Sequence, residues 1–115
     1  DLASASMIET HGARAFRALV EALDPAVVFG NEGEWAVIGG PTGRLRVDAV
    51  VKRGCRGATV MVGGAVTSLG IVPGAVVDVT GAGDALAAGY LVGGPEAAME
   101  AAARCISQVG AQPPA

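Results

Sequence analysis

Apolar positions along the chain alternate between helical spacing and short continuous runs. From Met7 to Leu23 they recur at helical spacing, which predicts one helix with an apolar stripe. Ser4 or Ser6 is suited to cap this helix at its N-terminus, and Asp24-Pro25 ends it. The run Ala26–Phe29 then predicts a short buried strand, because parallel strands covered on both faces are continuously apolar.

The middle of the chain has the pattern of strands separated by glycine-rich turns. A brief helix is expected over Trp35–Ile38, after the polar stretch Asn31–Glu34. The polar turn Arg53–Gly57 joins two predicted strands into a hairpin-like pair. In all, four strands are predicted here, over Val47–Lys52, Ala58–Val62, Ala65–Ile71 and Ala75–Asp78.

Two helices are predicted at the C-terminal end. The first begins near Gly81–Gly83 and runs to about Val92, where Gly93-Gly94-Pro95 breaks it. The second spans about Glu96–Val109 and is expected to be capped by Gly110. This order of elements fits an α/β sandwich with a mixed sheet, and no repeat or linker divides the chain.

Composition narrows the class of protein. Of the 115 residues, 51% are hydrophobic and 17% charged, which argues against disorder. A net charge of −3 and 3% aromatic residues disfavour nucleic-acid binding, and no apolar run is long enough for a membrane helix. Cys55 and Cys105 lack metal-type spacing and predict a reducing, cytoplasmic setting.

The chain starts at Asp1 without preceding strands, so we interpret it as part of a longer protein.

The turn Asp78–Asp84 carries the strongest candidate chemistry. Thr80 is suited to cap the following helix, and Gly81, Ala82 and Gly83 leave their N–H groups unobstructed. Free N–H groups at a helix N-terminus bind anions. An aspartate here repels a phosphate, but it is useful if Asp84 accepts a proton from an attacking hydroxyl. From the residues alone, an ordinary strand–turn–helix connection with Asp84 as a first-turn charge is an equal alternative.

The stretch Val77–Ala85, with Ala88-Gly89-Tyr90 after it, resembles the C-terminal signature of the ribokinase (PfkB) family of carbohydrate kinases. That signature is usually Asp-Thr-Thr-Gly-Ala-Gly-Asp, and Val79 replaces its commoner threonine. The resemblance implies that Asp84 is the catalytic base. It also implies that the N–H groups of Gly81, Ala82 and Gly83 form the anion hole for the transferred phosphoryl group.

Further motifs follow the family in order. Asn31–Glu34 resembles its Asn-x-x-Glu motif, and Lys52–Ala58 resembles a loop that touches the nucleotide. The resemblance implies that Glu34 holds Mg²⁺ through water. Taken alone, these two stretches fit a solvated acidic turn and a hairpin turn with solvated basic residues. The residues predicted to contact the nucleotide are Asn31, Glu34, Lys52, Gly54, Gly57 and Thr80.

The end of the chain, Gly110–Pro113, also resembles these kinases, as does its opening, Asp1–Ser4. The resemblance implies a monovalent cation, K⁺, beside the anion hole, although Pro114 lacks a hydroxyl that some relatives have. Plain C-capping of the helix is the alternative for Gly110. The positions that match the family's cation site are Asp78, Thr80, Cys105 and Gly110.

Together these motifs imply a ribokinase-like three-layer α/β/α sandwich with a mixed, mostly parallel sheet. Residues 1–115 would be the C-terminal nucleotide-binding part of a single kinase domain, without the N-terminal substrate and lid part. The implied activity is ATP- and Mg²⁺-dependent phosphotransfer to a sugar or nucleoside, weak or absent in this chain alone, in an enzyme that is a homodimer at full length. The alternatives are an inactive nucleotide-binding remnant and a structural or interaction fragment. His11 and both thiols are expected to have no catalytic role, and Trp35 to lie in the core.

Overall fold

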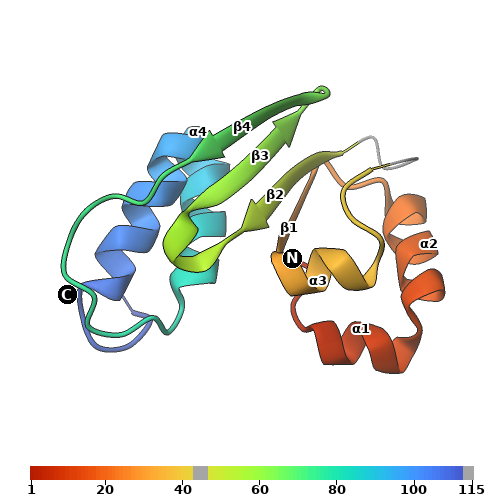
Figure 1. Ribbon diagram of the computed structural model, residues 1–115, viewed down its shortest axis with the longest axis horizontal. Helices are drawn as coiled ribbons and strands as arrows, with labels where there is room; N and C mark the ends of the chain where they lie inside the picture. Colours follow the sequence, from red (N-terminus) through yellow and green to blue (C-terminus); the bar gives the residue numbers. More distant parts are fainter. Residues whose placement is uncertain (43–46, 113–115) are drawn as a thin grey trace. The chain divides into compact units, whose positions relative to one another are not determined.

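Four strands form one mixed sheet in the order β1-β2-β3-β4 (Figure 1). β1 (Val27–Asn31) is parallel to β2 (Asp48–Lys52), and β2 is antiparallel to β3 (Ala58–Val62). β4 (Ala65–Leu69) is the last strand. The predicted hairpin of two strands on either side of Arg53–Gly57 is therefore confirmed. The next predicted strand also forms, but it ends at Leu69 and not at Ile71.

The computed structural model describes residues 1–42 and 47–112, so Pro113 and Pro114 lie outside the described residues. The chain divides into two units. The first comprises Asp1–Gly54 and Ala58–Ser68, and the second comprises Cys55–Gly57 and Leu69–Ala115.

In the first unit, three short helices accompany the strands: α1 (Ala5–His11), α2 (Ala13–Leu23) and α3 (Glu32–Val37). Ser4 caps α1 as predicted, since its side chain accepts a hydrogen bond from the Met7 N–H. The prediction of one helix over Met7–Leu23 is wrong. Gly12 has a φ of 103°, which a helix does not allow, and it separates α1 from α2.

The core of this unit lies between the helices and the first two strands. The Trp35 side chain is only 2% exposed, as expected, and its Nε1–H donates to the Val50 carbonyl at 3.2 Å. The start of the chain joins the same core, because Leu2 is buried and its N–H donates to the Phe29 carbonyl. The cluster comprises Leu2, Ile8, Val20, Val28, Trp35, Ile38 and Ala49.

The second unit is built on α4 (Ala82–Ile106), which contains the predicted break. Gly94 has φ 78° and ψ −164°, so two helical segments meet there, next to Pro95. A Cβ at Gly89 would lie 2.5 Å from the Ala97 carbonyl oxygen, so the two segments pack closely at this glycine. The second segment ends at Ile106 with Ser107 as its C-cap, which corrects the predicted end at Val109 and cap at Gly110.

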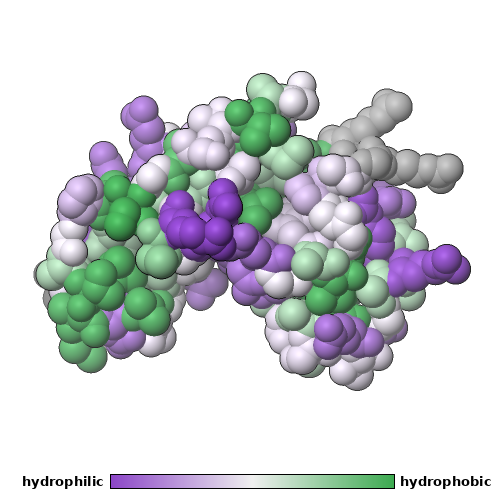
Figure 2. Space-filling model, in the orientation of Figure 1, coloured by the Kyte–Doolittle hydropathy of each residue, from purple (hydrophilic) through white to green (hydrophobic). Residues whose placement is uncertain are grey.

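The predicted strand Ala75–Asp78 does not form. The N–H groups of Val77 and Asp78 both donate to the Ile106 carbonyl, at 2.7 and 3.2 Å, so a helix end takes the donors that a strand ladder would use. The Val76 and Val77 side chains stay exposed, and Figure 2 shows apolar side chains gathered on the visible face of this unit. Among residues 1–42 and 47–112, no helix has both the length and the apolar character that crossing a membrane requires.

Candidate active site

The Gly-Ala-Gly turn lies at the N-terminus of α4, in the second unit. Gly81, with φ 77°, is the N-cap residue, and no side chain caps the helix, so the prediction that Thr80 does so is wrong. The Ala82 N–H donates to the Val79 carbonyl at 3.2 Å. No described residue accepts a hydrogen bond from the N–H of Gly83 or Asp84. These two first-turn donors therefore remain available to an anion.

Asp84 is in the first turn of α4, and its side chain is exposed. It lines an open pocket of about 610 Å³, and it is the one acidic residue among the described residues that do so. The rest of the lining is mostly small: Gly81, Ala85, Ala88, Gly89, Val92, Ala97, Ala101, Arg104, Cys105, Gln108 and Ala111. The turn thus presents a carboxylate and free N–H donors within a few residues of each other, beside a space that can admit a ligand.

Asp78 connects this turn to the loop after α4. Its Oδ1 accepts from the Thr80 N–H at 2.9 Å and from the Thr80 hydroxyl at 2.6 Å, and its Oδ2 accepts from the Gly110 N–H at 3.0 Å. The Thr80 hydroxyl, then the Thr80 N–H and the Gly110 N–H, hold the pKa of Asp78 below its usual range. The Thr80 hydroxyl is therefore used to fix Asp78 and not to cap α4.

The structure brings together the four positions predicted for a monovalent cation. Besides the contacts of Asp78, the Cys105 thiol donates to the Thr80 carbonyl at 3.3 Å. The oxygen atoms of Asp78 and Thr80 are suitable cation ligands, although each already accepts from protein donors. No cluster of three or more His, Cys, Asp or Glu residues suited to a metal occurs in the described part of the chain. The cation site stays a prediction.

Asn31 and Glu34 lie in the first unit, where they form a capping box at the start of α3. The Asn31 side chain accepts from the Glu34 N–H, and the Glu34 carboxylate accepts from the Asn31 N–H, both at 2.8 Å. Glu34 is only 4% exposed, so the interpretation as a solvated turn is wrong for this residue. Helix α3 also begins three residues before the predicted start, at Glu32.

The capping box leaves part of the Glu34 carboxylate available. The contact uses Oε2, and no described residue donates to Oε1. One oxygen can therefore still hold Mg²⁺ through water, which keeps the predicted role open. The spacing Asn-x-x-Glu before an apolar run is itself a capping-box signal, and sequence reasoning missed it.

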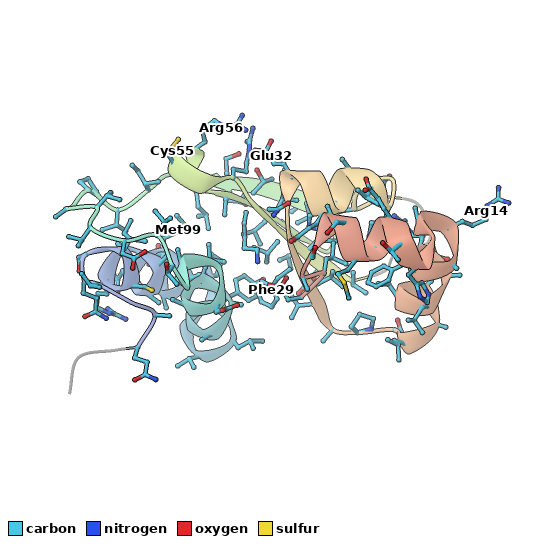
Figure 3. The ribbon with its side chains drawn as sticks, turned by 90° about the horizontal axis from the view of Figure 1, so that it is seen from below. Arg14, Phe29, Glu32, Cys55, Arg56 and Met99 are labelled. Atoms are coloured by element: carbon cyan, nitrogen blue, oxygen red, sulfur yellow. The ribbon has the colours of Figure 1, made fainter. Side chains whose placement is uncertain are left out.

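Lys52 lies at the end of β2, opposite Asn31 in the sheet register. Its ammonium group pairs with the Asp1 carboxylate at 2.7 Å, and its side chain is only 17% exposed, so it is not a solvated basic residue. Gly54 begins a 3-10 turn, η1 (Gly54–Arg56), in which Cys55 is exposed (Figure 3). Gly57 belongs to the second unit.

Sequence reasoning also missed Arg17. Its guanidinium group donates to the carbonyls of Ile38 and Gly40, at 3.0 and 2.5 Å, and to that of Thr42. It also pairs with Glu21 on its own helix. In contrast, Arg14 projects outward from α2 (Figure 3). Nothing in the sequence separates these two arginines, because the carbonyls that Arg17 binds are more than 20 positions away along the chain.

Solved structures similar to this chain include sugar and nucleoside kinases. A probable sugar kinase from Rhizobium etli is 22% identical, with a TM-score of 0.83 over 99% of this chain and 40% of its own. An adenosine kinase from Sinorhizobium meliloti is 25% identical, with a TM-score of 0.80 over 97% of this chain and 40% of its own. A ribokinase from Thermotoga maritima is 21% identical, with a TM-score of 0.63 over 79% of this chain and 39% of its own.

These likenesses show that the chain has part of the ribokinase-like α/β fold, as the sequence predicted. The chain spans about two fifths of the length of the solved kinases it matches. No protein-family model matches the chain. No curated protein matches it either.

Proposed function

We propose that the chain is the nucleotide-binding part of an ATP-dependent kinase that phosphorylates the hydroxyl of a sugar or a sugar-like molecule. The observation that carries the proposal is the start of α4, where unpaired N–H groups and the exposed Asp84 carboxylate occur together. The similarity of the fold to sugar and nucleoside kinases supports it. The acceptor is a sugar or a nucleoside, neither nucleic acid nor membrane takes part, and the setting is cytoplasmic.

In this proposal Asp84 accepts the proton of the acceptor hydroxyl as that hydroxyl attacks. The N–H groups of Gly81, Ala82 and Gly83 offset the charge that develops on the phosphoryl oxygens, and the Ala82 N–H would exchange the Val79 carbonyl for a phosphoryl oxygen to do so. Mg²⁺-ATP supplies the phosphoryl group when bound, and a monovalent cation would sit by Asp78, Thr80, Cys105 and Gly110. The remaining nucleotide contacts would come from Asn31, Glu34, Lys52, Gly54, Gly57 and Thr80.

Replacing the proposed base tests this function. Asp84→Asn in the intact kinase should lower kcat at least about a hundredfold, the lower range for loss of a general base, with ATP affinity nearly unchanged. Glu96→Gln is the matched control, because Glu96 is an exposed carboxylate on the same helix outside the pocket lining. A coupled assay gives kcat, and calorimetry gives ATP affinity. Wild-type turnover in Asp84→Asn would exclude Asp84 as the base.

The main alternative is a remnant that binds nucleotide without catalysis. Titrating Mg²⁺-ATP against the chain tests nucleotide binding, and a coupled assay with a panel of sugars and nucleosides tests transfer. We expect the 115 residues alone to bind Mg²⁺-ATP with weak or no turnover, and the intact, homodimeric kinase to turn over. Binding without turnover in the intact protein would favour the remnant. Failure to bind would favour a structural fragment.

A further inference from the structure

Apart from the two hydrogen bonds from Thr80 to Asp78, the turn before α4 has little internal support for its conformation. Gly81 is in the left-handed region, which glycine adopts readily but does not maintain on its own. No side chain caps the helix, and the internal bond from Ala82 to the Val79 carbonyl is long, at 3.2 Å. A fixed orientation of the free N–H groups therefore needs contacts from outside the turn.

The segment Cys105–Ala111, which we call the tail, supplies those contacts. The Ile106 carbonyl accepts from the N–H groups of Val77 and Asp78, and the Cys105 thiol donates to the Thr80 carbonyl. A Cβ at Gly81 would lie 2.5 Å from the Ala111 Cβ, so the tail packs directly behind the turn. The turn is thus held from the tail on both sides of Asp78.

Asp78 is the one side chain of the turn that bonds to both segments. Its carboxylate takes two donors from Thr80 and one from Gly110, which lies 32 residues away in the sequence. We call these three hydrogen bonds the Asp78 clasp. Only the bond from Gly110 crosses to the tail, and because charged acceptors make stronger hydrogen bonds than neutral ones, it is the strongest single hydrogen bond between turn and tail.

We infer that Asp78 is a positioning residue for phosphoryl transfer: its clasp fixes the turn against the tail, so that the first-turn N–H groups and Asp84 keep the orientation the reaction needs. The inference rests on the proposed function. Electrostatic catalysis depends on donors that are already oriented when charge develops. Asp78 acts through Thr80, and the reacting groups are those of Gly81 and the residues that follow it.

Asp78→Asn in the intact kinase removes part of the clasp without changing its volume. One of the two side-chain positions becomes an NH₂ group, which cannot accept from Thr80 or Gly110. We expect hydrogen exchange at the Thr80 and Gly110 amides to speed up about tenfold or more. We expect kcat to fall about tenfold to a hundredfold, with KM for the acceptor within about twofold. Glu96→Gln, the matched charge-removing control, should change neither.

This experiment distinguishes an effect of Asp78→Asn on folding stability from an effect on the orientation of the reacting groups. A purely structural role would lower Tm while kcat per folded molecule stayed at the wild-type value, and that result would overturn the inference. Wild-type exchange rates at Thr80 and Gly110 would also overturn it. If the wild type transfers no phosphate, the proposed function has failed. The role of the clasp in holding the turn is then tested by ADP binding. Weaker ADP binding by Asp78→Asn would support the clasp, whereas equal affinity, or no binding by the wild type, would refute it.

Discussion

A larger residue at Gly57 meets a steric overlap that its neighbour Gly54 does not share. Both glycines have positive φ, 86° and 58°. A Cβ at Gly57 would overlap the Leu69 carbonyl oxygen, whereas a Cβ at Gly54 would meet nothing within 4 Å. Both were predicted to contact the nucleotide, but at Gly57 packing alone already requires glycine.

The two alanine variants therefore separate backbone strain from steric overlap. Gly54→Ala should cost about 1 kcal/mol of unfolding free energy, the usual penalty of a left-handed residue with a Cβ. Gly57→Ala should cost about 1–3 kcal/mol more, because a backbone carbonyl must move. Urea denaturation measures both losses. Equal losses would mean that the Leu69 carbonyl shifts at no cost.

At the scale of elements, α3 is too short to be stable by itself and is fixed at both ends. The capping box of Asn31 and Glu34 holds its start, and Arg17 binds the Ile38 carbonyl at its end. This short helix carries the Asn-x-x-Glu motif, so the same contacts that stabilise it also place the carboxylate proposed to hold magnesium.

Arg17→Ala should destabilise the protein by about 2–4 kcal/mol, because several carbonyls would lose a charged donor. Arg14→Ala, on the same helix, should cost less than about 0.5 kcal/mol, since its side chain projects outward. Denaturation curves followed by tryptophan fluorescence compare the two. A loss for Arg17→Ala as small as that for Arg14→Ala would show that solvent replaces its hydrogen bonds freely.

At the scale of the whole molecule, the sequence predicted features that depend on neighbouring residues better than features that depend on residues far apart in the chain. Apolar runs and turn residues located the hairpin strands, and Gly94-Pro95 located the break in α4. The strand expected at Ala75–Asp78 failed, because an apolar run becomes a strand only where another strand pairs with it. Likewise, Thr80 has the residue type and position of a helix cap, but its hydroxyl donates to Asp78, a carboxylate that Gly110 also binds from the other end of the chain.

The first unit has a core of buried apolar side chains, so the effect of core substitutions on its unfolding free energy can be measured. Trp35, the only tryptophan of the chain, lies in that core, so its fluorescence reports the unfolding of this unit. Ile8 and Met7 are neighbours on α1, with exposures of 1% and 71%. Ile8→Ala should therefore cost about 2–5 kcal/mol, by lost burial and the cavity left behind. Met7→Ala should cost less than about 0.5 kcal/mol. Similar losses for the two variants would contradict the burial of Ile8 in the core cluster.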